Sequence, residues 1–334
     1  MWSRAQQDKT PCSTGELLSS LQTTGVSLSI EELINYQNKA SLINLTSTKN
    51  MHGQLAGNYL ARTKGRGMEF DEVRHYQTGD DIRTIDWRVT ARTGKTHTKL
   101  FREEIERPVI VATDLSANMA FGSRLLFKSV QAAHLAALIA WHTKQRGDRF
   151  GGIVFNDNQH LELKPRSRHQ GVLHYLHALT TTHQATIDAL NIGQISENKT
   201  ICFAENCMRI RQVARPGSLV YLITDGHHTS KDAIRHLSNI SQHCELVVCL
   251  ISDPLELELP QIDGKMNVSV TDGSSKQSLT LGDEKTAREY HNKASQFISD
   301  NESLLSKAGA RLIHFSAGQS LEQQIKNGVA PWIR

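Results

Sequence analysis

Residues 108–114 read PVIVATD, a short run of mainly β-branched and small residues that ends in an aspartate. A run of this kind is typical of a strand buried on both faces of a sheet. Four further apolar runs follow it along the chain: RFGGIVFN at 149–156, SLVYLITD at 218–225, ELVVCLIS at 245–252 and ARLIHFSA at 310–317. We therefore predict that these five runs are the strands of one buried sheet.

Helical segments separate these runs. Residues 125–141 are rich in alanine and apolar on nearly every side, as expected of a helix packed on a sheet. Further helices are expected at 169–179, 203–214, 230–241, 284–307 and 320–326. Strands that alternate with helices indicate βαβ units, so we expect an α/β fold with a doubly wound, mostly parallel sheet. A hairpin is expected around Asp272-Gly273, within residues 266–281.

The chain before residue 108 differs from this pattern. Ser29 is a candidate helix N-cap, with Glu32 three residues later to complete a capping box. Residues 53–107 are rich in glycine and charge and contain short β-prone pieces, which predicts a small β subdomain. We thus expect a flexible N-terminus at 1–27, a helix plus charged β subdomain at 28–107, and the α/β domain at 108–334.

Composition excludes several classes of protein. The 334 residues include 38 Lys or Arg and 34 Asp or Glu, a net charge of +4, and 38% of residues are hydrophobic. This is an ordinary globular composition, with no nucleic-acid signature in the total charge. We find no secretory signal and no apolar run near the roughly 20 residues that a membrane helix needs. Five cysteines do not suggest a disulfide framework, so we expect a cytoplasmic protein with reduced thiols.

Two of the predicted strands end in aspartate, at Asp114 and Asp225. Ligands of open parallel sheets bind outside the carboxyl ends of the strands, so both carboxylates should reach one rim. Ser116 and Asn118 follow Asp114 at alternate positions and add oxygen donors that suit Mg²⁺ or another hard divalent cation. The simpler alternative is that both aspartates cap the helices that follow them. A phosphatase that uses an aspartate nucleophile would need an acid at position 116, where this chain has serine.

This arrangement resembles the metal-ion-dependent adhesion site of von Willebrand factor A domains, whose first motif is Asp-x-Ser-x-Ser. The resemblance implies Asp114, Ser116 and Asn118 as ligands, with the asparagine in place of the last serine. It further implies Asp225 as the third motif and a threonine from a loop before a later helix. Thr200 is the best placed threonine, and Thr180, Thr181 and Thr182 are rivals.

Residues 62–107 form a block of mixed charge, with eleven Lys or Arg and nine Asp or Glu. Ile85 and Trp87 alternate with polar neighbours, which predicts a half-buried strand. The block is interpreted as a structural ion-pair network, as a partner-docking surface, or as a nucleic-acid site, and its aspartates argue against the last. The candidate partner-binding residues are Arg83, Asp86, Trp87, Arg88 and Arg92.

The same block carries a family resemblance. GRGMEF, YQTGDDIRTIDWRVTAR, KLFREE and DLSANMAFGSR, with the later DPLELELP at 253–260, are similar to motifs of the bacterial domain of unknown function 58 family. The resemblance covers roughly residues 28–315 and implies a von Willebrand factor A-like fold. Many members carry N-terminal membrane helices, which this chain lacks, so it resembles the soluble members. Members typically accompany MoxR-type AAA+ ATPases, which are thought to mature or activate other protein complexes, so the resemblance implies such a partner.

These observations favour a non-enzymatic protein-interaction module that serves as an accessory of a MoxR-type ATPase or binds a client protein. The metal-ion-dependent adhesion site would complete its coordination with a partner's carboxylate. Two alternatives from other classes remain: a Mg²⁺-dependent phosphoester hydrolase at the same rim, and a nucleic-acid-binding protein. The sequence contains no G-x-x-x-x-G-K-[ST] phosphate loop, so ATP binding of that type is not expected.

Overall fold

The computed structural model describes residues 14–42, 68–103, 107–166, 169–193, 199–260, 262, 264–271 and 276–327. The chain divides into two compact units, which are described separately. The first, here called the α/β unit, comprises Met1–Lys49 and Arg107–Arg334. The second, here called the charged unit, comprises Asn50–Glu106.

A six-stranded sheet forms the centre of the α/β unit, in the order β10-β7-β6-β3-β4-β5. Its strands are β3 (Pro108–Asp114), β4 (Arg149–Phe155), β5 (His160–Arg166), β6 (Leu219–Thr224), β7 (Glu245–Ser252) and β10 (Arg311–Ser316). All neighbours are parallel except β4 and β5. The predicted doubly wound, mostly parallel α/β fold is confirmed.

Strand β5 was not predicted. Its sequence HLELKPR is mostly polar, and most of its side chains are exposed, because it forms an edge of the sheet. An edge strand lacks the apolar run that identifies a strand buried on both sides, and its charged residues and Pro165 are typical of such edges. The sequence pattern therefore had no signal for it.

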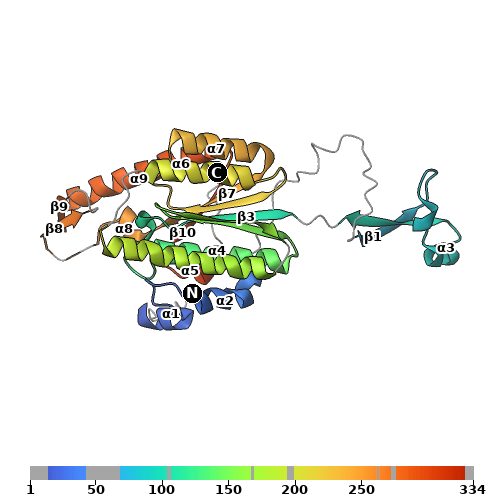
Figure 1. The fold of residues 1–334 in the computed structure, drawn as a ribbon, viewed down its shortest axis with the longest axis horizontal. Helices are drawn as coiled ribbons and strands as arrows, with labels where there is room; N and C mark the ends of the chain where they lie inside the picture. The colour runs from blue at the N-terminus through green and yellow to red at the C-terminus, as the bar shows by residue number, and fades with distance from the viewer. Residues whose placement is uncertain are drawn as a thin grey trace, which may run out of the picture. The chain divides into compact units, whose positions relative to one another are not determined.

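Helices cover both faces of the sheet (Figure 1). On one face lie α4 (Lys128–Gln145) and α5 (His169–Asn191); on the other lie α6 (Lys199–Val213), α7 (Lys231–His243) and α9 (Glu284–Lys307). Side chains along a strand point alternately to the two faces. In β3, Val109 and Val111 accordingly join the apolar cluster under α4 and α5, whereas Ile110 and Ala112 join the cluster under α6, α7 and α9.

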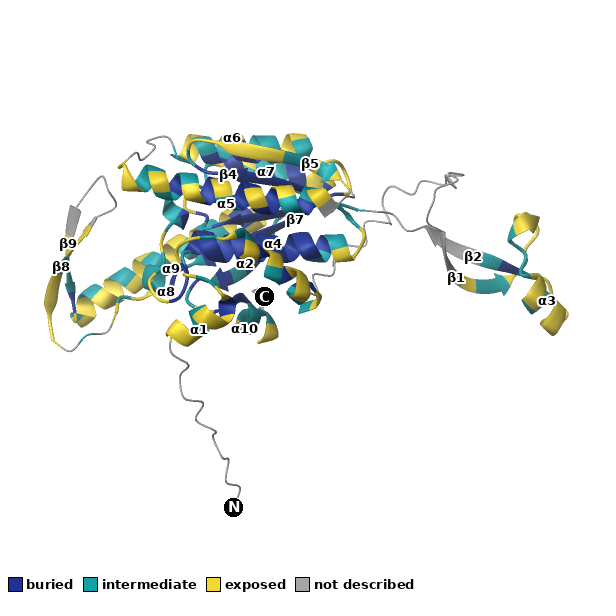
Figure 2. Ribbon diagram, turned by 60° about the horizontal axis from the view of Figure 1, so that its bottom comes forward, coloured by how far each residue is buried: buried dark blue, intermediate teal, exposed yellow. Residues whose placement is uncertain are grey.

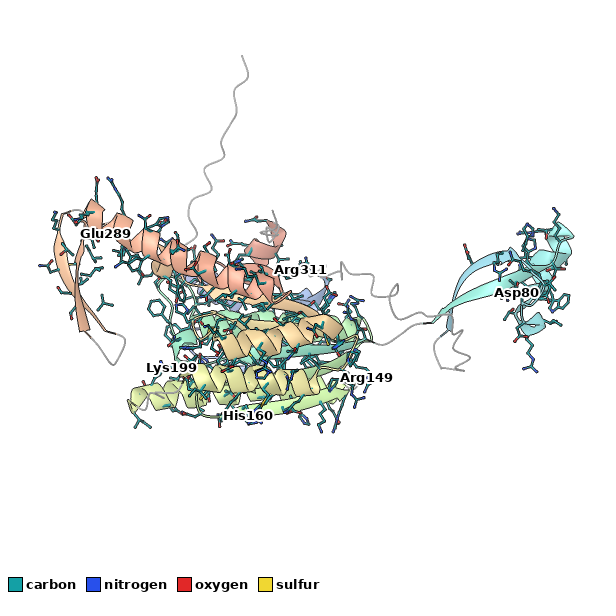
Figure 3. All side chains as sticks on the ribbon, turned by 90° about the horizontal axis from the view of Figure 1, so that it is seen from above. Asp80, Arg149, His160, Lys199, Glu289 and Arg311 are labelled. Atoms are coloured by element: carbon teal, nitrogen blue, oxygen red, sulfur yellow. The ribbon has the colours of Figure 1, made fainter. Side chains whose placement is uncertain are left out.

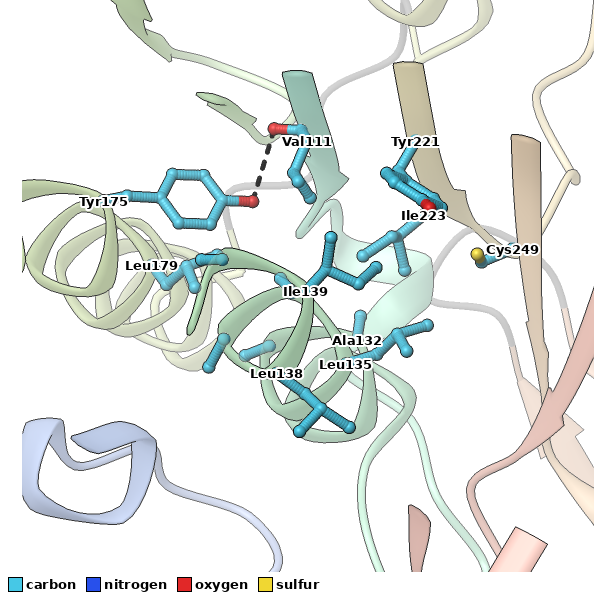
Figure 4. Close-up of a cluster of buried hydrophobic side chains, with 14 of the residues drawn as sticks. Val111, Ala132, Leu135, Leu138, Ile139, Tyr175, Leu179, Tyr221, Ile223 and Cys249 are labelled. Carbon is cyan, nitrogen blue, oxygen red and sulfur yellow. Dashed lines mark hydrogen bonds between the residues drawn. The ribbon is translucent and has the colours of Figure 1, made fainter. Parts of the chain in front are cut away.

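Helix α4 is almost entirely buried, as Figure 2 shows by its dark colour, and it carries the main apolar cluster. The close-up in Figure 4 shows Leu135, Leu138 and Ile139 of this helix among the side chains of that cluster. Tyr175 of α5 reaches the sheet over Gly152, where a Cβ atom would lie 2.4 Å from the tyrosine ring. The Tyr175 hydroxyl donates to the carbonyl oxygen of Val111 at 3.3 Å.

The N-terminal segment belongs to the α/β unit, so the helix that we expected to group with the β subdomain at 28–107 lies in the other unit. It contains α1 (Thr14–Leu21), α2 (Ile30–Asn35) and the 3-10 helix η1 (Tyr36–Leu42). Leu33 and Tyr36 are part of the main apolar cluster, and the Trp141 indole donates to the carbonyl oxygen of Leu33 at 3.0 Å. The capping box of Ser29 and Glu32 is present as predicted. The first thirteen residues lie outside the described residues.

The charged unit contains an antiparallel pair, β1 (Met68–His75) and β2 (His97–Glu103), with η3 (Ile82–Thr84) and α3 (Trp87–Thr93) between them. The predicted strand through Ile85 and Trp87 is wrong, because Trp87 begins a helix. Asp86 accepts hydrogen bonds from the backbone N–H groups of Arg88 and Val89 and so caps α3. Gly94 ends the helix in the left-handed conformation, at φ 69°.

Two smaller elements follow β7. Asp253 is the N-cap of helix α8 (Pro254–Leu257). The antiparallel hairpin of β8 (Met266–Thr271) and β9 (Lys276–Leu281) confirms the predicted pairing at 266–281. The predicted turn at Asp272-Gly273 lies outside the described residues. Among the helices described, none has the length and apolar character needed to cross a membrane. The helix α10 (Leu321–Lys326) packs near α4 and η1.

Candidate functional site

The carboxyl ends of β3 and β6 meet at one edge of the sheet, because the two strands are parallel neighbours. Thr224, the last residue of β6, donates its hydroxyl hydrogen bond to Oδ2 of Asp114 at 2.8 Å. Asp225 follows directly, and its charge acts on Asp114. The predicted convergence of the two aspartates is therefore present, and we call this edge the carboxyl rim.

Asp114 is held in a buried, hydrogen-bonded position, with 1% of its surface exposed. Its Oδ1 accepts a hydrogen bond from the backbone N–H of Ser116 at 3.0 Å. Burial, and next the negative charge of Asp225, raise the pKa of Asp114 to about 7, against the opposing effect of its hydrogen bonds. A proton or another positive charge is therefore favourable at this carboxyl near neutral pH.

Ser116 and Asn118 follow Asp114 as predicted, but they have different surroundings. The Ser116 hydroxyl is buried near the Asp114 carboxyl and helps to lower the pKa of Asp114. The Ser116 oxygen nevertheless lies at hydrogen-bonding distance and angle from no described group. Oδ1 of Asn118 accepts a hydrogen bond from the Lys199 ammonium at 3.1 Å. One candidate ligand thus has a free buried oxygen, and the other already has a cationic partner.

Thr200, the threonine expected to complete the site, is exposed in the first turn of α6. Its neighbour Lys199 reaches the carboxyl rim, as described above, whereas the Thr200 side chain forms no hydrogen bond with another described residue. The threonine that contacts Asp114 is Thr224, at the end of the adjacent strand. Sequence reasoning assigned Thr224 no role, because it looked only for a threonine in a loop.

Asp225 takes part in an ion-pair cluster in which its own side chain and that of Lys128 are buried. Its Oδ2 lies 2.9 Å from Nζ of Lys128, and the same ammonium lies 2.6 Å from Oε1 of Glu256. Nδ1 of His227 also approaches Oδ2 of Asp225, at 3.2 Å. Burial alone would raise the pKa of Asp225, but the His227 hydrogen bond and the Lys128 charge outweigh it and hold the pKa well below its usual range.

Lys128 is the positive centre of this cluster and is 1% exposed. Burial would lower the pKa of its ammonium, but the carboxylates of Asp225 and Glu256 outweigh burial and raise the pKa. Sequence reasoning did not single out Lys128 or assign Glu256 a role. A lysine in the first turn of an otherwise apolar helix was the available signal for the first, and the position of Glu256 in DPLELELP was the signal for the second.

These contacts test which residues could hold a metal. Asp225, His227 and Glu256 offer ligand atoms that all lie within 4.8 Å of one another. However, the Lys128 ammonium already contacts both carboxylates and supplies the positive charge there. Of the predicted donor set, Asp114 and Ser116 fit a hard cation, because the Ser116 oxygen has no other partner. To bind the cation, Asn118 would have to release the Lys199 ammonium and Asp225 the Lys128 ammonium, or share them with the cation.

A cavity of about 410 Å³ opens beside Asp225 and His227. Its walls are mainly apolar, with Leu250, Leu257 and Phe297 of α9 among the lining residues. The rings of His227 and Phe297 lie 4.9 Å apart. The carboxyl rim therefore has an apolar recess next to its charged cluster, which is a common setting for ligand recognition.

In the charged unit, three aspartates hold the backbone. Asp80 accepts from the backbone N–H of Gln77 at 2.9 Å and pairs with Arg74 at 2.7 Å. Asp81 caps η3, and Asp86 caps α3 while it lies 3.6 Å from Lys99. The backbone hydrogen bond from Val89 is the largest of the causes that lower the pKa of Asp86. Asp80 and Asp86 thus combine an ion pair with backbone hydrogen bonds, whereas Asp81 acts as a helix cap.

The four other predicted partner-binding residues, Arg83, Trp87, Arg88 and Arg92, are exposed. Trp87 exposes 67% of its surface, and the nearby Ile82 exposes 66%. No carboxylate among the described residues pairs with the three arginines. Figure 2 shows α3 as an exposed element of its unit. We call Ile82, Arg83, Trp87, Arg88 and Arg92 the arginine–tryptophan surface.

Comparison with protein families identifies the chain. The family described as "Protein of unknown function DUF58" matches residues 72–298, more than half of the sequence. The chain belongs to the DUF58 family. This confirms the resemblance seen in the sequence motifs, whereas the association with an ATPase stays a prediction. The match begins in β1 of the charged unit and ends in α9, so the DUF58 region includes both the arginine–tryptophan surface and the carboxyl rim.

Related sequences occur in mycobacteria. Uncharacterized proteins of Mycobacterium bovis and Mycobacterium tuberculosis are each 27% identical to this DUF58 chain over 220 residues. The aligned region spans 66% of this chain and 66% of each relative. The similarity thus covers a little under two thirds of the relatives.

Solved structures with some likeness include three bacterial proteins. The hypothetical protein BatB of Bacteroides thetaiotaomicron is 18% identical, with a TM-score of 0.37, and the match covers 60% of this chain and 99% of that one. An aerotolerance-related membrane protein of Bacteroides fragilis is 17% identical, with a TM-score of 0.38 and coverage of 67% and 98%. A von Willebrand factor type A protein of Catenulispora acidiphila is 12% identical, with a TM-score of 0.34 and coverage of 70% and 42%.

Proposed function

We propose that this DUF58 chain is a protein-interaction module and that its arginine–tryptophan surface docks on an acidic, partly apolar surface of a partner protein. The observation that carries the proposal is the exposure of Trp87 and Ile82 beside three arginines that lack carboxylate partners among the described residues. Trp and Arg are the residues most enriched at the energetic centres of protein interfaces.

The local energetics support a role in binding. Arg88 and Arg92 are four residues apart on α3, where like charges destabilise a helix by a few tenths of a kcal/mol. Asp81 and Asp86 use their carboxylates to cap η3 and α3 instead of neutralising these arginines. The capped backbone of η3 and α3 therefore presents arginine side chains whose positive charge is not neutralised by a described carboxylate. An acidic partner would neutralise this charge.

As the partner we propose a MoxR-type AAA+ ATPase or a client protein on which such an ATPase acts. The family resemblance supports this choice, and charge complementarity requires an acidic docking surface on the partner. An accessory of this kind would act by binding, so no turnover by this chain is required.

The test uses the full chain and the purified MoxR-type ATPase from the same source. We expect Trp87→Ala and the double variant Arg88→Ala/Arg92→Ala each to weaken the complex at least tenfold, because hot-spot residues contribute about 2 kcal/mol or more. Ile192→Ala is the matched control, since Ile192 is 72% exposed in the α/β unit. Equal affinity of all variants would contradict the docking surface, and absence of binding by the wild type would contradict the ATPase as partner.

A second proposal concerns a hard divalent cation at the carboxyl rim, held by Asp114 and Ser116, with Asp225 reached through water. The buried Ser116 oxygen without a hydrogen bond favours it. A bound cation would leave a coordination position for a carboxylate of the partner. Mg²⁺ titration by calorimetry should show saturable binding that Asp114→Asn and Ser116→Ala abolish, while Thr200→Val has little effect because Thr200 is exposed. No heat of binding in the wild type would contradict the cation.

The same proteins separate the alternative functions. Phosphoesterase turnover with Mg²⁺ or Mn²⁺ that is lost in Asp114→Asn would replace the non-enzymatic proposal by a hydrolase. Binding of DNA or RNA with a steep salt dependence that Arg88→Ala/Arg92→Ala reduces would assign the arginine–tryptophan surface to nucleic acid instead.

A further inference from the structure

We propose that the α/β unit has a pocket that binds a phosphoryl group. The pocket lies at the amino ends of the parallel strands, whereas the carboxyl rim lies at their carboxyl ends. A cavity of about 360 Å³ lies there between the edge strand β5, the end of α6 and the first residues of β3 and β4. Figure 3 shows Arg149, which lines this cavity, at the other end of the unit from Lys199 of the carboxyl rim. This proposal is independent of the docking surface and of the cation.

The charges around the cavity are predominantly positive. Arg149, Lys164 and Arg215 line it, whereas Glu162 is the one acidic residue among the described lining residues. None of the three cations forms an ion pair with a described carboxylate, and neither does Glu162 with a described cation. By contrast, two nearby basic residues are paired, Arg107 with Glu245 at 3.1 Å and Arg146 with Asp148 at 3.5 Å. The cavity therefore carries about two uncompensated positive charges.

A buried hydroxyl group provides a second, independent observation. Ser218, which also lines the cavity, is 0% exposed, and its Oγ has no hydrogen-bond partner among the described residues. A buried polar atom without a partner is unfavourable unless a ligand or water satisfies it. An oxygen atom of an anion bound between the cations would accept this hydroxyl hydrogen.

The donor set selects the ligand class. Two guanidinium groups present planar pairs of N–H donors that match the oxygens of a phosphoryl group, and an ammonium and a hydroxyl add further donors. The carbonyl end of α6 carries a partial negative charge of about one half, which opposes an anion. The net charge of the three cations and Glu162 exceeds this opposing partial charge, so a compact anion of charge near −2 is the best fit.

The experiment titrates the full chain with inorganic phosphate, and separately with pyrophosphate, by calorimetry at constant ionic strength adjusted with NaCl. We expect saturable one-to-one binding that weakens at least tenfold in the double variant Arg149→Gln/Arg215→Gln. Ser218→Ala should weaken it severalfold. Lys326→Gln is the control for loss of a surface charge, because Lys326 is exposed on α10 and does not line the cavity.

Glu162→Gln distinguishes a lost site from a damaged protein, since it removes the one acidic residue among the described residues that line the cavity. We expect it to tighten phosphate binding severalfold, a gain that misfolding cannot produce. Equal affinity in all variants, or a response that does not saturate, would overturn the pocket and leave only diffuse surface charge. Tight binding of single-stranded DNA without binding of inorganic phosphate would also overturn it, in favour of an extended polyanion site.

Discussion

Lys128 determines the charge balance of the carboxyl rim. Its ammonium contacts Asp225 and Glu256, which are 97 and 128 positions away in sequence. A buried ion pair gains less than its Coulomb energy because both ions lose water, yet removing one partner is costly because the other charge is left unpaired. Lys128 therefore supplies the counter-charge for the buried carboxylate of Asp225 and for the partly buried carboxylate of Glu256.

We predict that Lys128→Met lowers the free energy of unfolding by about 3–5 kcal/mol at pH 7, because Asp225 and Glu256 lose their counter-charge. Urea unfolding followed by circular dichroism measures this. Lys307→Met, at the exposed end of α9, removes a charge without a buried partner and should cost no more than about 0.5 kcal/mol. Equal effects of the two substitutions would show that the cluster contributes nothing to stability.

Asp114 leads to a prediction about pH. Its pKa in the folded protein is raised to about 7, so between pH 4 and 7 the folded state keeps a proton that the unfolded state has released. Stability from this residue is thus present at low pH and lost as pH rises through 7. In metal-free buffer, Asp114→Asn should stabilise the protein by roughly 1–3 kcal/mol at pH 8 and have little effect at pH 4. A constant difference across this range in urea unfolding would contradict the raised pKa.

At the scale of elements, local hydrogen bonds decide where helices begin and how they attach. The capping box of Ser29 and Glu32 could be predicted from sequence because its partners are three residues apart. The helix α3 was missed because Ile85 and Trp87 alternate with polar residues, whereas the Asp86 cap selects the helix. The attachment of the N-terminal segment depends on distant residues such as His183 of α5, whose Nε2 lies 2.9 Å from the carbonyl oxygen of Val26.

The Asp86 cap can be tested within its own unit. Asp86→Ala should destabilise α3 by about 1 kcal/mol, since it leaves the N–H groups of Arg88 and Val89 without their acceptor. Asp86→Asn keeps an acceptor and is the matched control. Amide hydrogen exchange in residues 87–93 should become faster in Asp86→Ala only. If both variants exchange at the same rate, the carboxylate does not cap the helix.

His183 makes the attachment of the N-terminal segment sensitive to pH. Burial lowers the pKa of His183 despite its hydrogen bond to Val26, so the folded state disfavours its protonation. Stability should therefore fall as pH drops below about 6.5, the ordinary histidine pKa. His183→Gln should remove up to about 1 kcal/mol of this loss between pH 7 and 5, measured by thermal unfolding. If His183→Gln and the wild type lose the same stability between pH 7 and 5, protonation of His183 does not cause the loss.

At the scale of the whole molecule, the apolar core lies in one unit and the densest mixed charge in the other. The described apolar clusters contain no residue of 50–106, so the α/β unit has its own core. The charged unit instead depends on hydrogen bonds and ion pairs, with Thr98 as its one described residue that is both polar and buried. The near-neutral total charge of the chain conceals this concentration of mixed charge.

We predict that replacing residues 50–106 by a Gly/Ser linker of about ten residues leaves the melting temperature within about 3 °C of the wild type. The same deletion should abolish binding of the proposed ATPase partner while keeping phosphate binding at the amino ends of the strands. Differential scanning calorimetry and the two titrations measure these outcomes. A fall of more than 10 °C would mean that the charged unit contributes to the core.

The sequence alone determined the α/β class, the central strands, the family, and the meeting of Asp114 and Asp225 at one rim. These features depend on local apolar runs and on the rule that parallel strands end at the same edge. Only the tertiary structure decided that Lys128 and Glu256 surround Asp225, that Thr224 and not Thr200 contacts Asp114, and that the arginines around Trp87 lack carboxylate partners among the described residues. Such contacts join residues far apart in the chain, and the charge and length of a side chain do not specify which distant partner the fold brings to it.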